Sequence, residues 1–139
     1  MNLDPITFEL ALRCSAEDAF TTYTERIAEW WDPRYTANPE TLMDVTIEPR
    51  AGWRVYATHS DSGEHDWGHV TVWEPARRLV HTFTLAQDPA HPSEVTIDFS
   101  DGRVDLAHGG WTEANAGDRK KFSDWPQILD RYASLANRQ

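Results

Sequence analysis

The sequence predicts one α+β domain over residues 1–139: a seven-stranded antiparallel sheet wrapped around a long C-terminal helix, with a short helix pair after the first strand. Three observations support this fold class. Alternating apolar and polar residues indicate a strand near the start of the chain. Several short, strand-like stretches separated by turn residues fill the middle. The end of the chain repeats apolar side chains at helical spacing.

Length and composition fit this fold. A chain of 139 residues with 40% hydrophobic residues can bury a core and is typical of one globular domain. The formal net charge of -10, with no basic run beyond residues 119–121, argues against nucleic acids and anionic membrane surfaces as partners. We therefore expect a protein that binds neither nucleic acid nor membrane.

Cysteine usage and the first residues bear on cellular location. Cys14 is the only cysteine, so the chain cannot form an internal disulfide. Residues 1–13 lack the basic start and apolar run of a signal peptide. No stretch reaches the ~20 apolar residues of a membrane-spanning helix. These features predict a cytoplasmic protein.

The first strand and the helix pair follow from local patterns. Residues 6–13 alternate between apolar and polar side chains, as in a half-buried strand. Ser15 is a suitable helix N-cap, with Asp18 three positions on as an imperfect capping box. The helical stretch must end before Pro33, and its length fits two short helices with a break near residues 24–26.

Trp30 and Trp31 stand side by side at the end of this helical stretch. Neighbouring side chains on a helix diverge by roughly 100°. The two rings therefore cannot pack on the same narrow stripe. We expect one to be buried against the sheet or last helix and the other to be partly exposed at the mouth of a cavity.

Six further strands are expected in the middle of the chain, with a tight turn at Asp101–Gly102. Their approximate extents are residues 41–49, 53–60, 66–75, 78–86, 93–100 and 102–110. The side-chain phase within 68–74 is ambiguous, because Val70 and Val72 compete with Thr71 and Trp73 for the interior.

The tail from Asp118 has helical periodicity. Pro126 falls inside it and predicts either a first turn after Ser123 or a kink. This helix is the only large element left to cover the sheet. The space between them is therefore either a filled core or a cavity.

Four stretches carry a resemblance to a known family: "AEDAFTTYTERIAEWWDP", "DWGHVTVWEPARRLVHTF", "AHGGW" and the "W..IL.RY" of the last helix. In combination they resemble the START-like (SRPBCC) superfamily, and within it proteins similar to the C-terminal domain of the heat-shock-protein-90 ATPase activator. The resemblance implies a helix-grip fold that encloses a hydrophobic cavity between the sheet and the C-terminal helix. Members of the superfamily include lipid and hormone binders, polyketide cyclases and many bacterial proteins of unknown role.

Alternation along the strands gives a candidate lining for this cavity. The candidate ligand-binding residues are Trp31, Trp53, Trp73, His81, Phe83, His108, Trp125 and Tyr132. Aromatic walls with a few polar groups are usual in small-molecule sites. In this interpretation His81 and His108 are the polar groups, and Tyr132 is the expected hydrogen-bond partner of His81. The alternative is that these side chains simply fill the core.

Other possible functional residues give weaker signals. Trp67 and Trp111 adjoin glycines at strand ends, where they either pack at the rim or contact a ligand. His59, His65 and His69 surround one hairpin without the helical spacing of a zinc motif. No phosphate-binding loop or nucleophile elbow occurs. We assign no catalytic residue, metal or cofactor.

Three functional hypotheses follow. The first is a protein that binds a hydrophobic small molecule, apolar or aromatic. The second is a cyclase- or dehydratase-like enzyme that uses His81 with Tyr132 or His108 on an aromatic or polyketide substrate. The third is a chaperone-interacting protein, which needs an exposed apolar patch and is favoured if Val70 or Val72 faces outward. An exposed tryptophan would also favour a homodimer.

Overall fold

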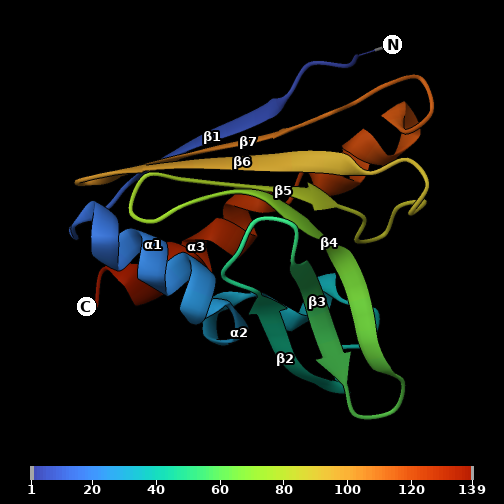
Figure 1. Cartoon of the computed structure of the whole chain (residues 1–139), viewed down its shortest axis with the longest axis horizontal. Coiled ribbons are helices and arrows are strands. Elements are labelled where there is room, and N and C mark those ends of the chain that lie inside the picture. Colours follow the sequence, from blue (N-terminus) through green and yellow to red (C-terminus); the bar gives the residue numbers. More distant parts are fainter. Residues whose placement is uncertain (1, 139) are drawn as a thin grey trace.

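A computed structural model describes residues 2–138 (Figure 1). The seven strands are β1 (Ile6–Ala11), β2 (Leu42–Ile47), β3 (Arg54–His59), β4 (Gly63–Glu74), β5 (Arg78–Phe83), β6 (Ser93–Ser100) and β7 (Arg103–Gly109). The helices are α1 (Ala16–Glu25), α2 (Ile27–Trp30) and α3 (Trp125–Ala136), with 3₁₀ helices η1 (Pro33–Tyr35) and η2 (Ala116–Phe122). The predicted fold class and order of elements are confirmed.

The strands form one antiparallel sheet in the order β1-β7-β6-β5-β4-β3-β2. The sheet is strongly twisted, so that β2 and β3 run across the direction of β1, β7 and β6 (Figure 1). Helices α1 and α3 lie side by side against it, and α2 contacts both α3 and β2. The core therefore sits between the curled sheet and the helices.

The helix pair forms where local chemistry predicts it. Ser15 caps α1 by accepting a 3.1 Å hydrogen bond from the backbone N–H of Asp18. The helix breaks at Arg26, and α2 ends at Trp30. Pro33, which cannot continue an α-helix, opens η1 instead. The N-cap, the break and the helix end are all as predicted.

The ambiguous phase of the fourth strand is explained by a β-bulge. Val70 pairs with His81, and the register then shifts before Val72 pairs with Val80. Val70 is fully buried, whereas the bulged Thr71 is exposed. Beyond the bulge, Trp73 packs its ring edge-on against Phe20 at 5.0 Å. The phase with Val70 inward is thus correct before the bulge, and the phase with Trp73 inward is correct after it.

Gly68 allows β4 and β5 to approach unusually closely. Its backbone has a φ of +148°, and a Cβ built there would lie 1.9 Å from the carbonyl oxygen of Thr82. Only glycine fits at that separation. The register of β3 against β4 also shifts beside it, between Val55 and Tyr56. The neighbouring Trp67 lies at this irregularity and is buried.

The C-terminal α-helix begins later than its periodicity suggests. Residues 116–122 form η2, and α3 starts only at Trp125, with Pro126 in its first turn. Proline clashes with the carbonyl four residues before it, so it is accommodated in a first turn but stops an α-helix from running through. The first-turn alternative is correct, and the helical tail predicted from Asp118 consists of a 3₁₀ helix followed by an α-helix. No helix in residues 2–138 is long and apolar enough to cross a membrane.

Trp30 and Trp31 point to two different surfaces, but both are buried. Trp30 is 1% exposed and contacts the rings of Tyr23 and Tyr132 at 4.8 and 5.2 Å. Trp31 is 3% exposed and contacts Trp67 at 5.1 Å. The predicted divergence is correct, and the predicted exposure of one ring is wrong. The loop after α2 folds over Trp31, whose indole N–H donates to the carbonyl of Tyr35 at 3.1 Å.

Candidate ligand pocket

A pocket of about 470 Å³ opens between the loop after α2, the facing ends of β4 and β5, and the start of α3. Its walls are mostly apolar and aromatic. They are formed by Trp31, Trp67, Phe83, Leu85, Phe122, Trp125 and Ile128. Polar side chains are interspersed among them, chiefly Arg34, Tyr35, His65, Asp66, Lys121 and Asp124.

Three tryptophans from three elements face one another around this space. Trp31 is the C-cap of α2, Trp67 lies on β4 and Trp125 opens α3. Trp31 contacts Trp67 at 5.1 Å and Trp125 edge-on at 5.9 Å. Trp31 therefore contacts both of the other tryptophan rings, which support it from two sides. Phe83, on β5, completes the group with its ring 6.2 Å from Trp125.

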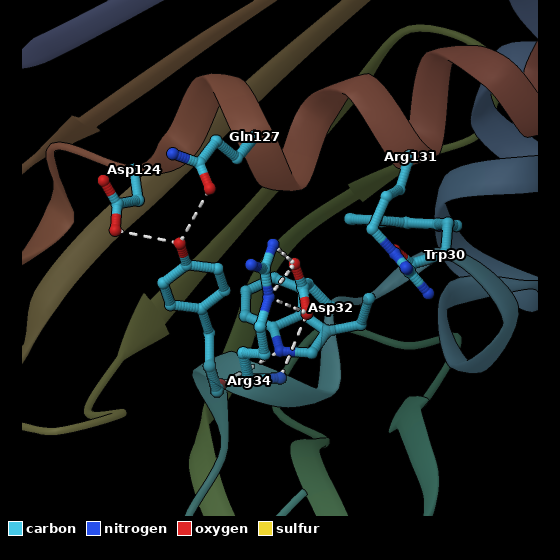
Figure 2. A network of polar contacts seen from close by, with 8 residues as sticks. Trp30, Asp32, Arg34, Asp124, Gln127 and Arg131 are labelled. Carbon is cyan, nitrogen blue, oxygen red and sulfur yellow. Dashed lines mark hydrogen bonds and ion pairs between the residues drawn. The ribbon is translucent and has the colours of Figure 1, made fainter.

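A hydrogen bond closes one side of the pocket. The phenol of Tyr35 donates to Oδ2 of Asp124 at 2.8 Å, and its oxygen lies 3.3 Å from Oε1 of Gln127. Figure 2 shows Asp124 and Gln127 at the start of α3, both directed toward the loop that carries Arg34. The bond to the Asp124 carboxylate raises the pKa of Tyr35, because the carboxylate favours the protonated phenol.

The loop that carries Tyr35 is braced by an internal ion pair. Arg34 donates from Nη2 to Oδ2 of Asp32 at 2.6 Å and from Nε to both carboxylate oxygens. Asp32 is 3% exposed, and its hydrogen bonds from Arg34 lower its pKa. Arg131 on α3 donates to the carbonyl of Trp30, which satisfies the C-terminal end of α2 (Figure 2). The mouth of the pocket is therefore anchored to α3.

Behind the pocket, a buried hydrogen-bond network holds Trp125. The indole N–H of Trp125 donates to Nδ1 of His108 at 3.0 Å, and Nε2 of His108 lies 2.6 Å from the hydroxyl of Ser93. An indole can only donate, so Nδ1 is the acceptor and the imidazole proton is on Nε2. Burial, with a smaller contribution from nearby His81, lowers the pKa of His108 to about 3. His108 is therefore a neutral group that orients a pocket wall.

Three of the predicted ligand-binding residues line the pocket: Trp31, Phe83 and Trp125. Three others lie in the core, outside its walls: His81, His108 and Tyr132. The predicted bond between His81 and Tyr132 is wrong. Tyr132 donates instead to the carbonyl of Ala19 at 2.7 Å, and His81 donates from Nδ1 to the carbonyl of Thr82 at 2.8 Å. Each of the two side chains therefore has a backbone carbonyl as its hydrogen-bond partner.

The remaining two predicted residues lie away from the pocket. Trp73 packs against Phe20 on the far side of the β4 bulge. Trp53 is 45% exposed, because β3 begins only at Arg54 and the alternation of that strand does not extend to residue 53. The guanidinium of Arg50 lies over its ring at 5.2 Å. Neither side chain lines the pocket.

Sequence reasoning missed the polar residues of the pocket. Tyr35 lies in a short 3₁₀ turn and Asp124 at a helix N-cap position, so neither belongs to an alternating or helical pattern. The available signal was the pair Asp124–Trp125 before Pro126, typical of a helix start. Of the two glycine-flanked tryptophans, Trp67 lines the pocket, while Trp111 is buried beside His108.

The histidines of the β3–β4 hairpin form a stacked pair. The ring of His59 lies 4.6 Å from that of His65, and its Nδ1 is 2.9 Å from the hydroxyl of Thr41. Nε2 of His59 is buried without a hydrogen-bond partner in the described chain. Within residues 2–138, no three His, Cys, Asp or Glu side chains are grouped as metal ligands.

The curled antiparallel sheet, the C-terminal helix that it grips and the pocket between them define a helix-grip protein of the START-like superfamily. Within it, the chain belongs to the family described as Activator of Hsp90 ATPase homolog 1-like protein, which it matches over residues 13–136. The predicted resemblance is thereby confirmed. A search of curated protein sequences found no match.

Solved structures share this fold along nearly the whole chain. The self-sacrificing resistance protein CalC from Micromonospora echinospora is 23% identical, with a TM-score of 0.70 over 99% of this chain and 97% of that one. Txn09, an anthrahydroquino-gama-pyrone synthase complexed with SUM, is 26% identical, with a TM-score of 0.67 over 97% and 99%. The Aha1 dimer from Colwellia psychrerythraea is 15% identical, with a TM-score of 0.68 over 96% of each chain.

Proposed function

We propose that this protein binds an apolar or aromatic small molecule in the pocket beneath the start of α3. The observation that carries the proposal is a space of about 470 Å³ walled by three tryptophans, with polar side chains interspersed. Small-molecule sites typically have volumes of about 300–1,000 Å³ and this mixture of apolar walls with a few polar groups. The complex of Txn09 with SUM, in a chain of the same fold, supports the proposal by analogy.

The pocket walls favour a flat, aromatic occupant. Trp31, Trp67 and Trp125 are the largest side chains of the lining, and aromatic rings pair well with another aromatic system. Their mutual contacts hold the rings in place, so little side-chain entropy is lost when a ligand enters.

A pocket-filling variant tests the proposal. Leu85→Trp places a large ring in the pocket from the segment after β5, while Leu3→Trp makes the same exchange at an exposed site outside it. We expect a panel of one- to three-ring aromatic compounds to raise the melting temperature of wild type and Leu3→Trp, and Leu85→Trp to lose this response. The absence of any response in wild type, or an undiminished response in folded Leu85→Trp, contradicts the proposal.

The two alternative functions have less support. The enzyme hypothesis depended on His81, His108 and Tyr132, and all three side chains are buried outside the pocket walls. The chaperone hypothesis is favoured if Val70 or Val72 faces outward, but Val70 is fully buried and Val72 is half-buried. Small-molecule binding is therefore the function that the site geometry supports best.

A further inference from the structure

We propose that the pocket selects aromatic ligands that carry a hydrogen-bond donor, a hydroxyl or a protonated amine, and that the Asp124 carboxylate accepts this donor. The inference rests on the proposed function and names the ligand class for the same pocket. It starts from the charged side chains of the lining and from the partners that each already has.

Four charged side chains line the pocket, and three of them are already in ion pairs. These pairs are Arg34 with Asp32 at 2.6 Å, Lys121 with Asp118 at 2.6 Å, and Asp66 with Arg54 at 2.6 Å. The Lys121 ammonium also donates to the carbonyl of Ala86 at 2.8 Å. Each cation of the lining is therefore already paired with a carboxylate, which reduces its attraction for an anionic ligand.

Asp124 is the fourth charged group, and it has no cationic partner within ion-pair distance in the described chain. Its one side-chain hydrogen bond comes from the neutral phenol of Tyr35, at Oδ2. No side-chain cap forms at the start of α3, although Asp124 stands at the N-cap position. Figure 2 shows the carboxylate turned to the side, with one oxygen toward the loop and the other free of a drawn contact. This carboxylate retains most of its capacity to accept hydrogen bonds.

Beside Asp124, the polar side of the pocket therefore presents acceptors. Tyr35 uses its only hydrogen on Asp124, which leaves its oxygen as an acceptor too. A ligand hydroxyl or ammonium placed here completes a charge-assisted hydrogen bond, whereas a ligand carboxylate meets a like charge. A protonated amine gains additionally from the tryptophan faces, which attract cations.

Three probes with one two-ring body separate these possibilities: 2-naphthol carries a donor, 2-methoxynaphthalene has the donor blocked, and 2-naphthoate is an anion. Calorimetric titration of the full chain is expected to give 2-naphthol about tenfold or more tighter binding than 2-methoxynaphthalene, with 2-naphthoate weakest. Asp124→Ala is expected to reduce 2-naphthol to the affinity of 2-methoxynaphthalene. Asp130→Ala, the same change at an exposed position of α3 outside the lining, should leave all three unchanged.

The outcomes distinguish the proposed ligand class from the proposed binding function. If 2-methoxynaphthalene binds but 2-naphthol is no tighter, or if 2-naphthoate binds best, the ligand class is wrong and the binding function stands. Equal weakening of all probes by Asp124→Ala also overturns the donor assignment. If Asp124→Ala fails to fold, the isosteric Asp124→Asn should still narrow the gap between 2-naphthol and 2-methoxynaphthalene. Failure of every probe to bind wild type contradicts both the ligand class and the proposed function.

Discussion

Trp125 donates its indole N–H to Nδ1 of His108 at 3.0 Å, and both side chains are buried, at 2% and 0% exposure. The bond joins a wall of the pocket to β7 in the core of the sheet. It requires that Nδ1 carry no proton, so the pocket wall depends on a neutral imidazole. Protonating His108 would abolish the acceptor and place an uncompensated charge in the core.

We expect stability to fall on mild acidification because of the two buried histidines. Burial lowers the pKa of His108 to about 3 and that of His81 to about 4, whereas an unfolded histidine titrates near ~6.5. Below that pH the unfolded chain binds more protons than the folded one. The two neutral histidines therefore make their full contribution to the free energy of unfolding above about pH 7. This contribution declines as pH falls, by about 1.4 kcal/mol per pH unit for each histidine.

Urea denaturation at pH 7.5, 6.0 and 5.0 measures this decline. His81→Phe should make the free energy of unfolding less dependent on pH. The exposed His91→Gln should leave this pH dependence as in wild type. An unfolding free energy that is constant across this range in wild type would contradict the prediction.

Both adjacent tryptophans should be important for stability. Trp30→Ala and Trp31→Ala each remove a ring that is 3% exposed or less, and such truncations cost about 3–5 kcal/mol. Denaturant melts measure both losses. Only the Trp31 change enlarges the ligand pocket, so it alone should also alter aromatic binding. A loss below about 1 kcal/mol at either site would show that the ring is not tightly packed.

Gly68→Ala should destabilise the protein strongly. The new Cβ would lie 1.9 Å from a backbone carbonyl of β5, which cannot move without separating the two strands. We expect a loss of about 3 kcal/mol or more, with Gly117→Ala, where a Cβ meets nothing within 4 Å, close to neutral. Thermal melts of both variants check this, and equal melting temperatures would refute the steric argument.

The exposed Trp53 supports a prediction about assembly. Its ring is 45% exposed on the outer side of the molecule, and tryptophan is enriched in protein interfaces. We expect wild type to sediment as a homodimer at micromolar concentration and Trp53→Ala to shift toward monomer. Met43→Ala, at another exposed apolar residue, is the control. A monomeric wild type would contradict the homodimer prediction and would leave the proposed ligand binding unaffected.

Most of the fold was predictable because it follows from periodic patterns. Alternation located the seven strands, and Ser15 and Pro33 marked the bounds of the helical segment between the first two. Exceptions arose where the period is interrupted, at the bulge around Thr71 and at Pro126. A bulge inverts the side-chain phase without an unambiguous mark in the sequence.

The pocket was less predictable because its polar side is built from loop and cap residues. Trp31, Phe83 and Trp125 follow from helix and strand positions. Tyr35 and Asp124 lie 89 residues apart and meet only through the tertiary fold. The two histidines chosen as polar groups are instead satisfied inside the core, since β-strand alternation indicates which face a residue occupies but not how deeply it lies.

The pairing of β1 with β7 has a consequence for how the chain reaches this structure. Ile6 pairs with His108 and Ala11 with Arg103, so the first strand of the sheet in sequence pairs with the last. Such distant pairings slow folding, because the long intervening loop must close before they form. During synthesis the N-terminal strand remains without its neighbour until residue 109 has left the ribosome. The sheet is therefore completed only after all seven strands have been made, and a chaperone that shields β1 would act at the growing chain.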